Sequence, residues 1–314
     1  MRLRTSPAIL HGPAGIAQPW GRRLLAPLAA ALLLSSAAAV HAQSPCSGLA
    51  PGADRPLRNL AYQPPTPDLP RSVHLLDLWP GATATPAPLV VFVHGGTWMY
   101  GGKYAGTPRQ ARAFRQAGYA YATVNYRLLR HGPPQEAARD IAEAVAFLRR
   151  EAKGCGLDPE RIILMGHSAG AHLAALVALD ESYLEAAGVP PQTVRAAILL
   201  DAYGLDIARH VRETGDRVYA RVFGPNPAGW TAMSPVTHAA PGRPPPPVLM
   251  HVDADNAETP GQARILAEAL RAAGGEAQIH EAEGESHNSL NYGFGAEGDK
   301  TTRLTLDFLA AWVR

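Results

Sequence analysis

Ser168 has the strongest chemical context of any serine in the chain, because it is the centre of Gly-His-Ser-Ala-Gly. The apolar stretch 161–165 before it predicts a short strand, and 169–179 after it predicts a helix. The two glycines of the motif remove the Cβ atoms where strand and helix must approach closely. We therefore predict a sharp strand-to-helix turn that presents the Ser168 hydroxyl as a nucleophile, with the Ala169 N–H at the helix start beside it.

A nucleophilic serine needs a general base, and the base needs a carboxylate that orients it. His287 is the predicted base, because it lies in the Gly/Ser/Asn loop that follows a strand-like stretch and precedes the last helix. Asp255 is the predicted acid, because it follows the apolar run 248–252 in a polar turn. Asp253 is the second candidate from this turn. A different strand end offers two further carboxylates, which rank lower: Asp201 and Asp206.

The segment His-Gly-Gly-Thr-Trp at 94–98 directly follows another continuous apolar run. Adjacent glycines let the backbone turn so that N–H groups point into a cavity, as an oxyanion hole requires. We predict that Gly95 and Gly96, together with Ala169, donate these N–H groups. A plain structural Gly-Gly turn is the alternative.

Strand-like and helix-like stretches alternate from residue 73 to the C-terminus, which predicts one α/β domain over 73–314. Its sheet should be mainly parallel and covered by helices on both faces. A long irregular stretch, 203–244, reads as an insertion, and the Pro-rich segment 43–72 reads as an extended lead-in. In such sheets ligands bind beyond the carboxyl ends of the strands, where all the candidate residues fall.

The first 42 residues have the pattern of an export signal. A basic region ending at Arg23 precedes the apolar run 24–40, and Val40-His-Ala42 fits a cleavage site. The run is shorter than the roughly 20 residues that span a bilayer. We expect a periplasmic or secreted protein without stable membrane insertion after cleavage; an uncleaved signal anchor is the alternative. In an oxidising compartment Cys46 and Cys155 either pair or stay free.

Composition excludes some partners. The net charge of +2 is too small to indicate a nucleic-acid partner, and 46% hydrophobic residues is ordinary for a soluble enzyme. No feature of the sequence indicates an oligomeric state.

Together these motifs resemble the α/β-hydrolase family, and specifically its HGGxW branch. That branch contains hormone-sensitive-lipase-like carboxylesterases, kynurenine-formamidase-like amidases and bacterial feruloyl-esterase-like proteins. The resemblance runs from about Leu89 to the C-terminus and implies an α/β-hydrolase fold. The motifs that carry it are HGGTWMYGGK (94–103), VNYRL (124–128), DPERIILMGHSAGAHLA (158–174), MSPVTH (233–238), PVLMHVDADN (247–256) and ESHNSLNY (285–292).

The resemblance implies that Ser168 is the nucleophile, Asp255 the acid and His287 the base, with no metal or organic cofactor. The acid region departs from the family's usual His-Gly-x-x-Asp, because the chain reads His-Val-Asp-Ala-Asp at 251–255. We expect a serine hydrolase that cleaves small or mid-sized carboxylic esters through an acyl-enzyme. An arylformamidase-like amidase that acts on N-formyl aromatic amines is the alternative. Three aromatic residues could line the substrate pocket or pack in the core: Trp98, Tyr100 and Tyr203.

Overall fold

The computed structural model describes residues 44–47, 55–82, 85–240 and 242–313. The predicted signal segment, 1–42, lies outside these residues. Within the described part of the chain, no helix is both long enough and apolar enough to cross a membrane.

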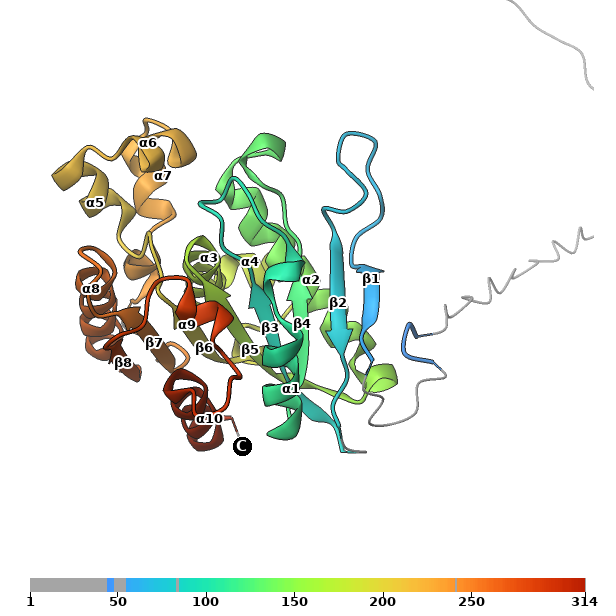
Figure 1. Ribbon diagram of the computed structural model, residues 1–314. Coiled ribbons are helices and arrows are strands. Elements are labelled where there is room, and N and C mark those ends of the chain that lie inside the picture. Colours follow the sequence, from blue (N-terminus) through green and yellow to red (C-terminus); the bar gives the residue numbers. More distant parts are fainter. Residues whose placement is uncertain (1–43, 48–54, 83–84, 241, 314) are drawn as a thin grey trace, which may run out of the picture. The chain divides into compact units, whose positions relative to one another are not determined.

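The core of the fold is a sheet of eight strands in the order β1-β2-β4-β3-β5-β6-β7-β8 (Figure 1). The pairs β1/β2 and β2/β4 are antiparallel, and every other neighbouring pair is parallel, as predicted. The strands span Leu57–Ala61 (β1), Leu75–Trp79 (β2), Ala87–Val93 (β3), Ala120–Val124 (β4), Leu157–His167 (β5), Val194–Leu200 (β6), Val248–Asp253 (β7) and Ala277–Ala282 (β8).

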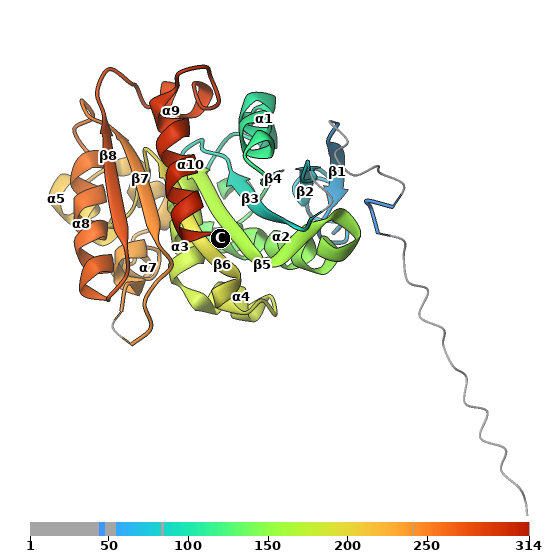
Figure 2. The ribbon, with the colours of Figure 1, turned by 90° about the horizontal axis from the view of Figure 1, so that it is seen from below.

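Helices cover both faces of this sheet, because the central strands are apolar on both sides. Along β3, Val91 and Val93 belong to one buried cluster, whereas Val90 and Phe92 belong to the other. Figure 2 shows α1 and α10 on one side of the sheet and α2 and α3 on the other. These helices span Pro108–Gln116 (α1), Pro134–Cys155 (α2), Ala169–Leu179 (α3) and Lys300–Trp312 (α10).

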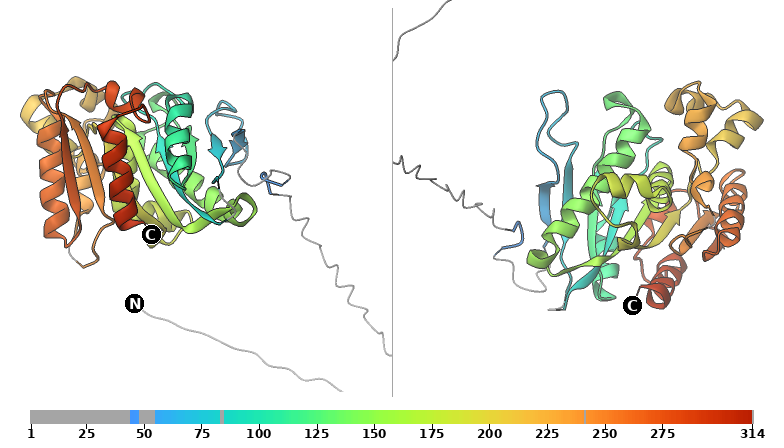
Figure 3. Two further views of the ribbon diagram at one scale, coloured as in Figure 1. Left: turned by 60° about the horizontal axis from the view of Figure 1, so that its bottom comes forward. Right: turned by 180° about the vertical axis from the view of Figure 1, so that it is seen from behind.

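The predicted insertion, 203–244, folds into three short helices followed by the 3₁₀ turn Pro235–His238. The helices span Ile207–Thr214 (α5), Arg217–Phe223 (α6) and Pro227–Ala232 (α7). They gather beyond the carboxyl ends of the parallel strands (Figures 1 and 3). The remaining helices span Glu181–Ala186 (α4), Thr259–Ala272 (α8) and Ser289–Tyr292 (α9), and further 3₁₀ turns span Lys103–Ala105, Leu129–His131 and Pro191–Thr193.

Part of the Pro-rich segment predicted as a lead-in forms regular structure. It contributes the edge strand β1, whose residues are partly or fully exposed, so no hydrophobic alternation marked it in the sequence. Cys46 forms a disulfide with Cys155 at the end of α2, and both cysteines are buried. The bond ties the described residues 44–47 to the body of the domain.

Candidate active site

Ser168 occupies the predicted strand-to-helix turn, between the end of β5 and the start of α3. Its backbone has φ 57° and ψ −125°, a conformation that a residue with a side chain rarely adopts. A Cβ on Gly166 would lie 2.2 Å from the carbonyl oxygen of Gly170, and one on Gly170 would lie 2.2 Å from that of Val93. The two glycines are therefore required by the close approach of strand, helix and neighbouring strand.

The Gly-Gly turn after β3 lies against this serine. A Cβ on Gly95 would lie 3.0 Å from the Ser168 Cβ, and Gly96 has φ 115°, which favours glycine. Ala169 begins α3, where the first N–H groups have no partner inside the helix. Two of the three predicted N–H donors, Gly95 and Ala169, thus lie beside Ser168, and Gly96 follows Gly95 in the same turn.

His287 approaches the serine from the loop between β8 and α9, and its Nδ1 lies 2.7 Å from Oδ2 of Asp201. Asp201 directly follows β6 and is fully buried. Its Oδ1 accepts hydrogen bonds from the Asp253 N–H at 3.0 Å and from the Thr259 hydroxyl at 2.5 Å. The carboxylate is therefore held by three donors, and its bond to Nδ1 leaves Nε2 of His287 available to the serine.

The structure does not bring Asp255 to His287, which corrects the predicted acid. The Asp255 side chain is exposed, and its backbone N–H donates to Oδ1 of Asp253 at 3.0 Å. Asp253 contacts His287 at the backbone and not at the ring, because its Oδ2 accepts from the His287 backbone N–H at 3.2 Å. Because β6 and β7 are neighbours in the sheet, the carboxyl ends of both strands lie beside the loop that carries His287. The residue that bonds to the His287 ring is Asp201, after β6. Asp206, the other candidate near that end, instead caps α5.

His167 is a part of the site that the sequence analysis did not single out. Its Nε2 lies 2.7 Å from the carbonyl oxygen of His287, so this nitrogen carries the proton and donates. The two rings are 4.5 Å apart between centroids. Burial, followed by the charge of His287, lowers the pKa of His167 to about 4, which keeps this ring neutral near pH 7. His167, the residue before Ser168, thus holds the loop that carries His287. Its position inside the Gly-His-Ser-Ala-Gly motif is the signal by which the sequence could have indicated it.

A cavity of about 310 Å³ opens onto Ser168, Ala169 and His287. Two of the three predicted pocket aromatics, Trp98 and Tyr203, line it. Tyr100 does not line it, and this residue is 63% exposed. The other lining residues come from the insertion and from the residue preceding α8: Asp216, Val218, Tyr219 and Glu258, with Thr97 from the Gly-Gly loop.

His172 connects the Gly-Gly loop to the insertion. Its Nδ1 accepts from the Trp98 indole N–H at 3.0 Å, and its Nε2–H donates to the Met233 carbonyl at 2.7 Å. The residue is completely buried, and burial lowers its pKa to about 4. A neutral histidine with one fixed tautomer therefore holds the Trp98 wall of the cavity in place.

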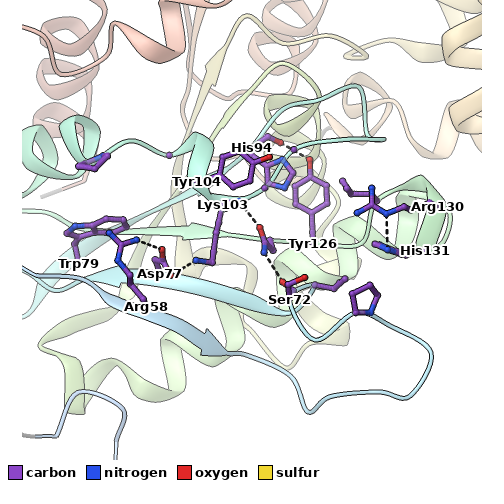
Figure 4. Close-up of a pocket in the computed structure, with 18 residues that line it drawn as sticks. Arg58, Ser72, Asp77, Trp79, His94, Lys103, Tyr104, Tyr126, Arg130 and His131 are labelled. Atoms are coloured by element: carbon purple, nitrogen blue, oxygen red, sulfur yellow. Dashed lines mark hydrogen bonds and ion pairs between the residues drawn. The ribbon is translucent and has the colours of Figure 1, made fainter.

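A second and larger cavity, of about 530 Å³, lies on the other side of the Gly-Gly loop and does not contain Ser168. Figure 4 shows Arg58 and Lys103 both pointing toward Asp77 there, at 3.0 and 2.6 Å. His94 lines this cavity and stacks on Tyr126, whose hydroxyl donates to the His94 carbonyl at 2.7 Å. The contacts of Tyr126 fix His94, which directly precedes the Gly-Gly turn.

Comparison with known proteins identifies relatives of this arrangement. The BD-FAE family model matches residues 76–270. Isoprenylcysteine alpha-carbonyl methylesterase ICME of Arabidopsis thaliana is 27% identical over 65% of this chain and 51% of its own. Esterase LipQ of Mycobacterium tuberculosis is 26% identical over 75% of this chain and 59% of its own. The chain thus spans little more than half the length of these curated relatives.

Solved structures are similar over more of their length. The thermophilic esterase Est2 of Thermogutta terrifontis, bound to butyrate, superposes with a TM-score of 0.63 at 26% identity, over 76% of this chain and 89% of its own. Another structure, of Thermogutta terrifontis esterase 2 phosphonylated by sarin, superposes with a TM-score of 0.61 at 25% identity, over 75% of this chain and 89% of its own. From the family model, the strand order and these superpositions, the chain belongs to the BD-FAE family and has the α/β-hydrolase fold.

Proposed function

We propose that this protein is a serine carboxylesterase in which Ser168, His287 and Asp201 form the catalytic triad. One observation carries the proposal. Ser168, in the strained turn, lines the same cavity as His287, whose Nδ1 is bonded to the buried Asp201 carboxylate. A serine, a histidine and a buried acid in this chain of contacts are the parts that nucleophilic acyl transfer needs.

In the first half of the reaction, Nε2 of His287 takes the proton of Ser168 as Oγ attacks the ester carbonyl carbon. The carbonyl oxygen becomes an oxyanion that accepts hydrogen bonds from the N–H groups of Gly95, Gly96 and Ala169. Asp201 keeps the Nδ1–H tautomer of His287 and stabilises the imidazolium that forms. His287 then gives its proton to the departing alcohol as the C–O bond breaks, which leaves the acyl group on Ser168.

In the second half, water repeats the steps that the serine performed. His287 removes a proton from the water, the hydroxide attacks the acyl carbon, and the Ser168 oxygen leaves with the proton that His287 returns. The enzyme is restored and the carboxylic acid is released. Fixed donors at the oxyanion contribute about 10²–10³-fold each to turnover in such sites.

The substrate class follows from the cavity and from the similar proteins. A cavity of about 310 Å³ favours small or mid-sized esters. The similar Thermogutta terrifontis esterase binds butyrate in one structure and is phosphonylated by sarin in another, which supports a short acyl group and a reactive nucleophile here.

The test compares purified protein with the Ser168→Ala variant on short p-nitrophenyl esters and on an N-formyl arylamine. We expect ester hydrolysis that falls by about 10⁴-fold or more in the variant. Undiminished ester hydrolysis in Ser168→Ala would refute the proposed nucleophile. Hydrolysis of the formyl amide far faster than all esters would favour the amidase alternative instead.

We also propose that the protein is exported, with cleavage after Ala42. The Cys46–Cys155 disulfide supports this location, because disulfides persist in oxidising compartments. Fractionation of cells that express the full chain, with N-terminal sequencing of the product, tests it: a mature protein that keeps residues 24–40 in the cytoplasmic fraction would contradict export.

A further inference from the structure

The cavity above Ser168 has an unusual charge distribution. Among the described residues that line it, Asp216 and Glu258 are acidic and none is Lys or Arg. The two carboxylates come from separate parts of the chain, since Asp216 precedes α6 in the insertion and Glu258 precedes α8. A substrate in this cavity therefore meets two carboxylates and no basic Lys or Arg side chain among the described lining residues.

The two carboxylates belong to one cluster that also contains His210 of α5. His210 Nε2 lies 3.4 Å from Asp216 Oδ2, and its Nδ1 lies 3.5 Å from Glu258 Oε1. The Tyr219 hydroxyl donates to the same Oε1 at 2.7 Å, and the Gln262 side-chain amide also donates to it. Among the hydrogen bonds of the described residues, none goes to Oε2 of Glu258, so this oxygen can accept one from a ligand.

Among the ion pairs of the described residues, His210 is the partner of both carboxylates, and no Lys or Arg pairs with either. Burial raises the pKa of the Glu258 carboxyl; the hydrogen bond from Tyr219 and the proximity of His210 lower it, and Asp216 and Asp201 raise it further. A positive charge in the cavity would favour the ionised carboxylate, because opposite charges stabilise each other at this range. Aromatic rings stand beside the carboxylates, since Trp98, Tyr203 and Tyr219 line the same cavity. Aromatic rings attract ammonium groups through their negative faces.

We propose that this cavity selects esters that carry a positively charged ammonium group, and that Glu258 and Asp216 are the specificity-determining pair. The combination of carboxylates, aromatic rings and an adjacent nucleophile carries the proposal, which rests on the proposed esterase function. An ester with an anionic group of similar size would be repelled by the same two side chains.

The experiment compares acetylcholine with its uncharged carbon isostere, 3,3-dimethylbutyl acetate. The two esters share acyl group, length and shape, so the ratio of their kcat/KM values isolates the charge. We expect a ratio of about 10 in favour of acetylcholine, as a partly desolvated ammonium–aromatic and ion-pair contact implies. The ratio should fall as salt is added and also as the pH is lowered and Glu258 becomes protonated.

Three variants complete the test. Glu258→Gln and Asp216→Asn should each move the ratio toward 1, and a general loss of folded enzyme would not change a ratio. Glu213→Gln is the matched control, because Glu213 is exposed on α5 and pairs with Arg209 outside the cavity. Its ratio should equal that of the unaltered protein.

The outcomes separate this proposal from the esterase proposal. Hydrolysis of the neutral ester with a ratio near 1 in the unaltered protein overturns the charge preference alone. The same holds for a ratio of about 10 that persists in both Glu258→Gln and Asp216→Asn. If the protein hydrolyses none of the three esters (acetylcholine, 3,3-dimethylbutyl acetate and p-nitrophenyl acetate), the esterase proposal is overturned and the charge preference with it.

Discussion

Nδ1 of His287 and Oδ2 of Asp201 are 2.7 Å apart, although 86 residues separate them in the chain. The contact joins the loop after β8 to the end of β6, across the intervening strand β7. Asp253, at the end of β7, bridges the two, because its backbone N–H donates to Asp201 and its side chain accepts from the His287 N–H.

This contact predicts which carboxylate turnover depends on. Asp201→Asn should lower kcat on p-nitrophenyl acetate by about 10³–10⁴-fold, because the imidazole loses its orienting charge and tautomer. Asp255→Asn is the matched control and should stay within about 2-fold, since its side chain is exposed. A larger loss of kcat in Asp255→Asn than in Asp201→Asn would instead identify Asp255, after β7, as the acid.

The His167 bond predicts a positioning effect. His167→Phe keeps a ring against His287 but removes the Nε2–H donor, which leaves the His287 carbonyl without that partner. The loss of such a hydrogen bond costs about 1–3 kcal/mol, so kcat should fall by about 5–150-fold. A shift in the pH–rate profile should accompany the fall, because the variant changes the surroundings of His287. An unchanged kcat and profile would show that the bond does not hold the loop.

The close contacts at the turn predict opposite results for two glycine substitutions. Gly166→Ala places a methyl group 2.2 Å from a backbone oxygen and should destabilise the fold by about 1–3 kcal/mol or prevent folding. Gly261 lies inside α8, and a Cβ added there would meet no other residue within 4 Å. Gly261→Ala should therefore stabilise the fold by about 0.5–1 kcal/mol. Guanidinium unfolding measures both; equal effects would contradict the steric explanation.

The disulfide predicts a loss of stability on its removal. Cys46 and Cys155 are 109 residues apart, so their bond closes a long loop in the unfolded chain. Replacing both by serine should lower the free energy of unfolding by about 2–5 kcal/mol. Reduction of the unaltered protein should give a similar loss, whereas the double variant should be insensitive to reductant.

Buried histidines predict that stability falls in mild acid. Burial lowers the pKa of His94, His167 and His172 to about 4, and that of His251 to about 3. The unfolded chain binds these protons near pH 6.5, so the native state loses stability as pH falls from about 6.5 toward 4. Each histidine contributes up to about 1.4 kcal/mol per pH unit in this window.

A single histidine variant tests this effect through the slope of the free energy of unfolding against pH. His251→Asn removes one titrating group from the sheet, where His251 contacts His280 and Thr305. Its free energy of unfolding should depend less steeply on pH between 6.5 and 5 than that of the unaltered protein. Parallel pH curves for the two proteins would rule out His251 as a contributor.

The sequence by itself determined most of the helices and strands and the local setting of Ser168. The apolar runs around Ser168, the paired glycines and the order of strands and helices each depend on local periodicity and backbone freedom, which residues in succession encode. The mainly parallel sheet, the Gly-Gly turn and the presence of Ser168 and His287 at one cavity are consistent with these patterns. The strand β1 was missed because an exposed edge strand lacks the alternation that a buried face imposes.

Only the tertiary structure decided which carboxylate meets His287. Asp201 and Asp255 both follow apolar strands that end at the same edge of the sheet, so their sequence contexts are equivalent. The choice depends on how the β7–α8 turn bends, since that bend exposes Asp255 and uses Asp253 to hold Asp201. The acidic wall of the cavity was decided in the same way, because Asp216 and Glu258 become neighbours only when the insertion folds over the sheet and packs beside α8.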